Sequence, residues 1–239
     1  MKLPLLFTAF ILVMAAIPKV APAPDKVDTV RGLPIEVSAA ARDLIVHYEV
    51  GGESYYRKYL QRPTYPGGAS GVTVGFGYDC GYNTAAQIRK DWGGRLPKAE
   101  VEALASTSGL KGTRAANEIL RVKWTVSVPW ETAQAVFEQS TMPRFAALTK
   151  SAFPDIATAH PHGQGAILSL AFNRGTSMSG DSRREMREIR DRLQPAPDKI
   201  PASIRAMKRL WLGKGLDGLL LRREAEAQLF EKGLLTIRP

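Results

Sequence analysis

Apolar and polar residues alternate along GVTVGFGYD, residues 71–79. The even positions are all aliphatic or aromatic, whereas the odd positions are three glycines, one threonine and one aspartate. Since side chains alternate across a strand, the pattern predicts a strand with one apolar face and one nearly bare face. The preceding YYRKYLQ, residues 55–61, predicts a second strand, and the turn-rich RPTYPGGAS between them predicts an antiparallel pair.

Elsewhere the apolar positions recur at helical spacing. A first helix is predicted from Glu36 to Glu49, where Gly51-Gly52 ends it. Beyond residue 83 the predicted helices are 84–92, 97–107, 113–122, 131–141, 143–152, 163–174, 182–193, 202–212 and 217–232. The run DSRREMREIRDRL predicts a solvated helix with Arg184–Glu188 and Glu188–Arg192 pairs. Together these elements predict a mostly helical α+β fold with a small N-terminal β hairpin and a helical C-terminal lobe.

The N-terminus has the pattern of an export segment. Lys2 precedes an apolar run over residues 3–17, and the small residues Ala21 and Ala23 flank Pro22. We therefore expect residues 1–23 to be a signal peptide, with an uncleaved N-terminal anchor as the alternative because Pro24 is a poor neighbour for cleavage. Residues 24–34 are expected to form a linker and 35–239 a single domain. The protein is expected to be exported, to the periplasm or the outside of the cell.

Composition limits the classes of partner. The 239 residues are 44% hydrophobic and 23% charged, with a net charge of +10. Loss of residues 1–23 removes Lys2 and Lys19 and no acid, which leaves 10 − 2 = +8. A basic surface suits nucleic acid, a membrane surface or an acidic wall polymer. The export segment and the lack of a nucleic-acid-binding motif favour the wall polymer.

Metal and thiol chemistry have little support in the sequence. His160 and His162 lie two apart, but no third ligand cluster is visible, so no metal and no cofactor are expected. Cys80 is the only cysteine, which excludes an intramolecular disulfide, and it is interpreted as a small buried residue.

Glu49 is the first candidate for catalysis. At the end of a helix it lies near backbone carbonyls, and partial burial beside Tyr48 adds desolvation, so both effects favour the protonated form that a general acid needs. Glu53 is the rival, although it follows two glycines and has less to fix it.

The bare strand face gives further candidates. Three glycines permit close approach by a ligand or by a packed helix, while Thr73 offers a hydroxyl and Asp79 a carboxylate. Six residues of extended strand span about 20 Å, so either the chain bends at Gly77 or these two groups serve different purposes. Two carboxylates flanking a groove are the minimum requirement of a glycoside hydrolase.

Several motifs, taken in order, resemble the phage-type muramidases (endolysins) of the lysozyme-like superfamily. These are HYEVGGESYY, GVTVGFGYD, AILSLAFNRG and KRLWLGKGLDGLLLRREAEAQLF, which together span about residues 44–232. The commonest phage pattern has an aspartate or cysteine some six residues before the threonine, where this chain has Gly67. The later Asp79 instead resembles the pesticin-type muramidases.

The resemblance implies a lysozyme-like fold and specific roles. Glu49 would be the general acid, Asp79 the second carboxylate and Thr73 the hydroxyl that positions water. Gly75, Gly77, Tyr78 and Asn173 would contact the sugar, and the chain would bend after Gly77. Arg222 and Arg223 are expected to position the last helix.

The expected activity is hydrolysis of the β-1,4 linkage between N-acetylmuramic acid and N-acetylglucosamine in peptidoglycan. An inactive peptidoglycan-binding module and a chitin-directed hydrolase are the alternatives. The partner would be the glycan strand, bound by a monomer that contacts neither nucleic acid nor, apart from its export segment, a membrane.

Overall fold

The computed structural model describes residues 27–237, so the predicted signal peptide lies outside the described residues. The helices are α1 (Ala39–Val50), α2 (Glu53–Tyr59), α3 (Ala85–Trp92), α4 (Lys98–Ala105), α5 (Thr113–Val122), α6 (Trp130–Val136), α7 (Met142–Ala152), α8 (Pro161–Arg174), α9 (Arg184–Arg192), α10 (Ile200–Ala206) and α11 (Asp217–Ile237). The strands β1 (Thr73–Val74) and β2 (Tyr78–Asp79) form an antiparallel pair. The fold is therefore mostly helical with one small sheet, as the sequence predicts.

The hairpin differs from the prediction, because residues 71–79 form both of its strands. The chain reverses at Gly75 and Gly77, whose φ angles are 59° and 74°. These left-handed conformations favour glycine, which has no Cβ to clash. The predicted bend after Gly77 is thus wrong by a few residues, since the turn precedes Tyr78.

The strand predicted over residues 55–61 is also wrong, because helix α2 occupies most of this segment. Tyr56 is buried on its inner side and donates a hydrogen bond to the Val128 carbonyl at 3.0 Å. Tyr55 and Tyr59, four residues apart, place their ring centroids 4.7 Å apart. Aromatic residues favour strands only when a sheet surface is available for them to pack on. Here Tyr55 and Tyr59 instead pack on one another at the i,i+4 spacing of a helix.

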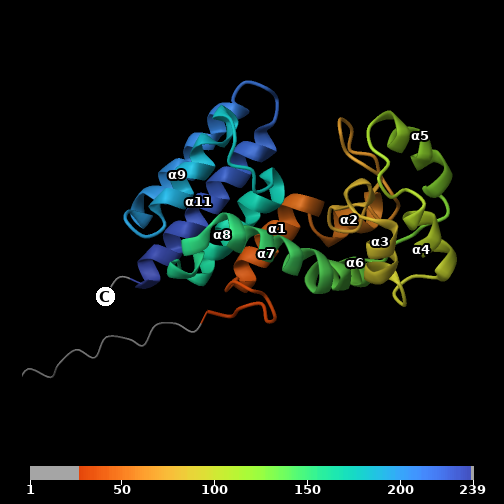
Figure 1. The fold of residues 1–239 in the computed structure, drawn as a ribbon, viewed down its shortest axis with the longest axis horizontal. Coiled ribbons are helices and arrows are strands. Elements are labelled where there is room, and N and C mark those ends of the chain that lie inside the picture. The colour runs from red at the N-terminus through yellow and green to blue at the C-terminus, as the bar shows by residue number, and fades with distance from the viewer. Residues whose placement is uncertain (1–26, 238–239) are drawn as a thin grey trace, which may run out of the picture.

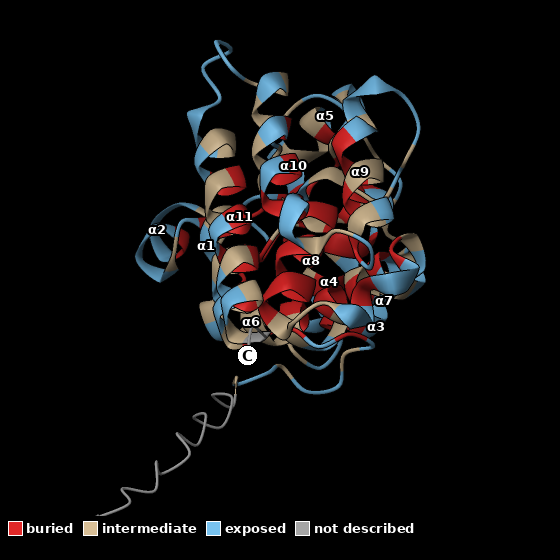
Figure 2. Ribbon diagram, turned by 90° about the vertical axis from the view of Figure 1, so that its left-hand side faces the viewer, coloured by how far each residue is buried: buried red, intermediate tan, exposed pale blue. Residues whose placement is uncertain are grey.

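Helix α8 forms the centre of the larger lobe. Its residues from His162 to Ala171 are buried, and Figure 2 shows it enclosed by other helices. It packs against α1, α7 and α11. A Cβ at Gly165 would lie 2.1 Å from that of Ala41, so this glycine allows α1 to cross α8 closely. The crossing fixes the position of α1, and with it the end that carries Glu49.

The helices group into two lobes joined by a continuous helical segment. Figure 1 shows α8, α9 and α11 on one side, α2 to α5 on the other, and α6 and α7 running between them. A π-helical segment, Phe137–Thr141, joins α6 to α7, and Pro143 falls in the first turn of α7. A proline is tolerated there because the first amides of a helix have no partner within it. The helices predicted separately over residues 131–141 and 143–152 are therefore continuous.

The N-terminal end of the described chain lies against the domain. Val30 donates to the Val37 carbonyl and Ala39 to the Asp28 carbonyl, both at 2.8 Å. Ser38 caps α1 by accepting from the Ala41 amide, so the helix begins three residues after the predicted Glu36. Within residues 27–237 no helix combines the length and the apolar character that a membrane span requires.

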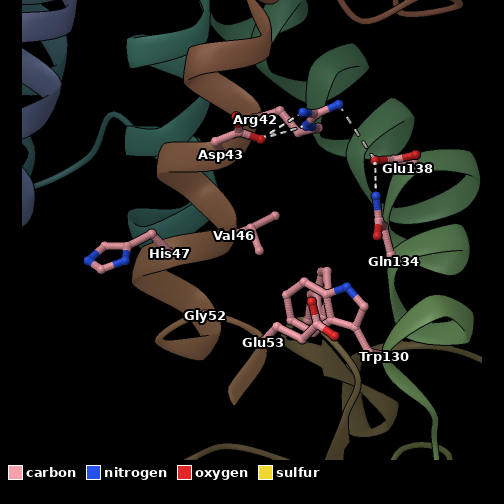
Figure 3. Close-up of a pocket in the computed structure, with 10 residues that line it drawn as sticks. Arg42, Asp43, Val46, His47, Gly52, Glu53, Trp130, Gln134 and Glu138 are labelled. Atoms are coloured by element: carbon pink, nitrogen blue, oxygen red, sulfur yellow. Dashed lines mark hydrogen bonds and ion pairs between the residues drawn. The ribbon is translucent and has the colours of Figure 1, made fainter. Parts of the chain in front are cut away.

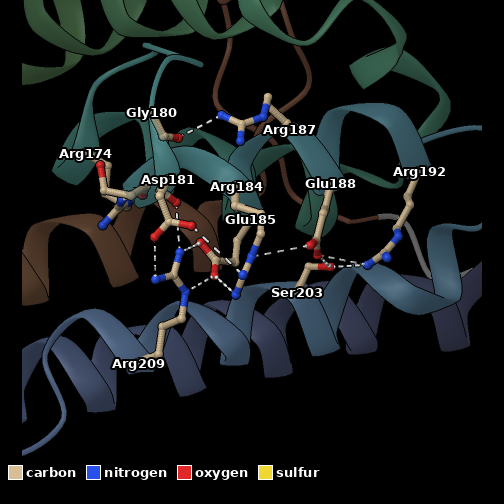
Figure 4. A network of polar contacts seen from close by, with 11 residues as sticks. Arg174, Gly180, Asp181, Arg184, Glu185, Arg187, Glu188, Arg192, Ser203 and Arg209 are labelled. Atoms are coloured by element: carbon tan, nitrogen blue, oxygen red, sulfur yellow. Dashed lines mark hydrogen bonds and ion pairs between the residues drawn. The ribbon is translucent and has the colours of Figure 1, made fainter.

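The charged helix α9 makes both predicted ion pairs, Arg184–Glu188 at 3.9 Å and Arg192–Glu188 at 3.3 Å. It is less solvated than predicted, because Met186 and Ile189 are buried. Glu185 is also buried and pairs with Arg209, whose guanidinium lies 2.5 Å away (Figure 4). The network therefore ties α9 to the segment that follows α10.

Candidate active site

Glu49 lies in the last turn of α1, which Gly51 ends in a left-handed conformation with φ 66°. Its side chain is 20% exposed, and Oε1 accepts a hydrogen bond from Nη1 of Arg222 at 2.7 Å. A charge-assisted contact of this length fixes the carboxylate. The partner comes from α11, 173 residues further along the chain.

Arg222 belongs to a buried polar network. Its side chain is 3% exposed and its Nε lies 3.2 Å from Oε1 of Glu226, which is fully buried. Ser169 on α8 donates to the same oxygen at 2.6 Å. Burial raises the pKa of Glu226, although two neighbouring guanidinium groups oppose the shift. The expectation that Arg222 positions the last helix is thus incomplete, because this residue also holds Glu49.

The other oxygen of Glu49 faces the turn of the hairpin. A Cβ placed on Gly77 would lie 3.2 Å from Oε2. The missing side chain at Gly77 therefore lets the backbone approach the carboxylate. A Cβ on Gly75 would lie 3.0 Å from the ring of Trp92, so this glycine makes room for packing.

Asp79 uses both of its oxygens to hold the hairpin. Oδ1 accepts from the Gly81 amide at 2.8 Å, and the Gly71 amide donates to Oδ1 and Oδ2 at 3.1 and 2.9 Å. A Cβ on Gly71 would lie only 2.3 Å from Oδ1. The three glycines of the bare face thus serve three purposes, which are to admit Asp79, Trp92 and Glu49.

Thr73 lies directly opposite Asp79 in the register of the two strands. Directly paired residues have Cβ atoms about 5 Å apart and on the same face, so the 20 Å separation of an extended strand does not apply. Thr73 exchanges backbone hydrogen bonds of 2.9 Å with Thr64, and its hydroxyl donates to the Gly71 carbonyl at 3.3 Å.

Tyr78 is mainly a core residue, with an exposed fraction of 2%. Its hydroxyl donates to Asp91 at 2.8 Å, and Arg144 pairs with the same carboxylate at 2.7 Å. Burial of Tyr78 and its bond to Asp91 raise the pKa of the phenol. The side chain of Tyr78 therefore has little exposed surface for the predicted contact with a sugar.

Two cavities of about 380 Å³ each lie beside these residues. The first, called the Glu49 cavity below, is lined by Tyr48, Glu49, Asn173, Arg222 and residues 215–219. The second is lined by Gly77, Tyr78, Asp79 and residues of η1 (Cys80–Tyr82) and α7. The structure thus brings Asn173 to Glu49 and places Gly77 between the acid and the cavity of Asp79.

The remaining reactive groups are structural. Burial raises the pKa of the Cys80 thiol to about 12, which keeps it protonated near neutral pH. His162 lies 2.8 Å from the Ser38 hydroxyl, and the His162 amide donates to the ring of His160. Among residues 27–237 no group of three or more potential metal ligands occurs.

No protein-family model matches the chain, and no curated protein matches it.

Proposed function

We propose that this protein is an exported muramidase with a lysozyme-like fold. The observation that supports this best is the position of Glu49, which lies at the end of a helix, in an open cavity, with one oxygen on Arg222 and the other toward a glycine turn. A small hairpin beside a helical lobe is the arrangement that the resemblance to phage-type muramidases implies.

In this proposal Glu49 is the general acid. Arg222 occupies Oε1, so Oε2 is the oxygen that can deliver a proton to the glycosidic oxygen of a sugar lying along the hairpin. Asn173 lines the same cavity and offers an amide that can bind a hydroxyl or an acetamido group. Breaking the bond leaves positive charge on the sugar, which a second group must stabilise or quench with water.

Asp79 and Thr73 are the proposed second group. A carboxylate accepts about four hydrogen bonds, and backbone amides make three contacts with Asp79. One acceptor position is left for a water, and the hydroxyl of Thr73 lies on the same face of the hairpin. Asp79 would therefore hold the hairpin and also orient the water.

The substrate class follows from the resemblance and from the charge. A net charge of +10 favours an acidic polymer such as peptidoglycan. An inactive binding module would show the same attraction, so turnover must be measured directly.

The test is digestion of purified peptidoglycan followed by mass spectrometry of the products. The proposal expects fragments that end in reducing N-acetylmuramic acid and expects Glu49→Gln to produce none. Wall binding without fragments would support the binding module instead, and cleavage of chitin oligomers alone would support the chitin-directed hydrolase.

A further inference from the structure

A third cavity, called the hinge cavity below, lies between α1, the start of α2 and α6. It measures about 250 Å³ and shares no lining residue with the Glu49 cavity. Figure 3 shows Val46 and Trp130 facing one another across it, with Glu53 in front of the indole. The cavity lies just below the range of roughly 300–1,000 Å³ typical of pockets for drug-sized ligands, so it suits a single ring.

The floor of the hinge cavity is aromatic and rigid. The rings of Trp130 and Phe76 lie 4.5 Å apart, and Trp130 packs edge-on against Tyr56 at 5.4 Å. These contacts fix the indole while leaving it partly exposed. An aromatic face carries partial negative charge, and it therefore attracts the polarised C–H groups on the flat side of a pyranose.

The rim consists of planar polar groups. Gln134 donates to Oε1 of Glu138 at 3.0 Å, and a guanidinium nitrogen of Arg42 lies 3.9 Å from the same oxygen. Within residues 27–237 the second oxygen of Glu138 and the amide oxygen of Gln134 make no hydrogen bond. Both are partly exposed acceptors, so the rim can bind a ligand that donates hydrogen bonds.

The charge of the lining excludes an anionic ligand. Three carboxylates border the hinge cavity, those of Asp43, Glu53 and Glu138, and Arg42 is the one lysine or arginine among the described lining residues. A phosphate or a carboxylate would be repelled there. Hydroxyl groups on a neutral ring satisfy both the acceptors of the rim and the aromatic floor.

We propose that the hinge cavity binds one neutral sugar ring of the N-acetylhexosamine type, at a site separate from Glu49. The site does not depend on the muramidase activity. In an active muramidase it would hold a second part of the glycan.

The test uses the full chain with Glu49→Gln, titrated with the neutral disaccharide of N-acetylglucosamine. The indole N–H signal of Trp130, assigned by its loss in Trp130→Phe, reports the site by nuclear magnetic resonance. The proposal expects this signal to shift in a saturable way. Adding Glu138→Gln should weaken the binding about tenfold or more, because a hydrogen bond to a charged acceptor is lost.

The matched control is Glu102→Gln, which makes the same change at a side chain that is 47% exposed, pairs with Arg89 and lies outside the cavity. It should leave the titration unchanged. An unmoved Trp130 signal, equal effects of the two glutamine variants, or a shift produced by a simple alkyl diamine but not by the sugar would each overturn the proposal. Binding at Trp130, together with a wild-type protein that cuts no peptidoglycan, would retain the site and reject the proposed function.

Discussion

Glu49 and Asp79 are the two carboxylates predicted to share one reaction, yet their surroundings are opposite. Glu49 has a single described hydrogen-bonded partner, the guanidinium of Arg222, and it borders an open cavity. Asp79 is held by three backbone contacts that shape the hairpin around it. Glu49 therefore keeps one oxygen free for a further contact, whereas both oxygens of Asp79 already serve to hold the local backbone.

The largest expected effect is on the rate of peptidoglycan cleavage, and it separates the role of Glu49 from that of Asp79. Glu49→Gln removes the proton donor and should lower the rate of peptidoglycan cleavage by about 10²–10⁴-fold, the usual contribution of general acid catalysis. Asp79→Asn keeps the acid and should cost about tenfold. Turbidity loss of wall suspensions measures both, and Glu102→Gln, an exposed glutamate paired with Arg89, is the control. Equal losses for the two variants, without a change in stability, would show that Asp79 contributes as much to the reaction as Glu49 does.

The next effect concerns Arg222, whose guanidinium pairs with both Glu49 and Glu226. Arg222→Met removes one of the two guanidinium groups that pair with buried Glu226, which keeps Arg223, and it also removes the partner of Glu49. It should lower the free energy of unfolding by about 1.5–3 kcal/mol, the usual contribution of a hydrogen bond to a charged group. Urea unfolding followed by circular dichroism measures it. Arg190→Met breaks the exposed pair with Asp191 and should cost no more than about 1 kcal/mol. If both variants lose the same amount, the network around Arg222 does not stabilise the fold.

A smaller effect tests the close packing around Asp79. Gly71→Ala places a Cβ 2.5 Å from the Gly81 amide nitrogen and should destabilise the protein by about 1–3 kcal/mol. Gly218→Ala is the control, because no atom lies within 4 Å of its added Cβ and its φ is not left-handed. If Gly71→Ala unfolds at the wild-type midpoint temperature, the hairpin accommodates the added Cβ without loss of stability.

The smallest effect is a dependence of the stability on pH, which arises from Asp91 beneath the hairpin. Burial alone would raise the pKa of Asp91, but hydrogen bonds from Tyr78 and Arg144 outweigh it and lower the pKa below its ordinary value of 3.8. A lowered folded-state pKa means that the stabilisation is present above pH 3.8 and is lost as the pH falls through the lower value.

Urea midpoints measured from pH 7 to pH 2.5 check this dependence. The wild type should lose more stability below pH 4 than Asp91→Asn does, because the variant has no carboxylate to protonate. Parallel curves for the two proteins would show that Asp91 does not contribute to acid unfolding.

Much of the helical framework follows from local patterns. Thr84, the first residue of the predicted helix 84–92, caps α3, and α5 spans its predicted residues 113–122. The predicted α11 ends five residues early, since the pattern of charged and apolar residues fades before Ile237. Helix caps and apolar periodicity act over a few residues, so the sequence contains them directly.

The wrong strand over residues 55–61 has a different origin. Tyrosines favour strands in general. Only the hydrogen bond from Tyr56 to the carbonyl of Val128, on a distant segment, shows that Tyr56 belongs to a helix and is buried. Likewise the pairing of Thr73 with Asp79 depends on a turn that the alternating pattern concealed. In the first case a non-local contact, and in the second the turn at Gly75 and Gly77, decided between local preferences of similar strength.

By itself, the sequence determined that the chain is mostly helical, that a glycine-rich hairpin lies near its beginning, and that Glu49 ends a helix. Only the tertiary structure decided that Arg222 reaches Glu49 and that Gly77 lies against its second oxygen. It also decided that Asp79 is occupied by backbone amides. Periodicity and caps are short-range properties, whereas the partner of a charged side chain depends on which helices cross, and that is set by packing across the whole core.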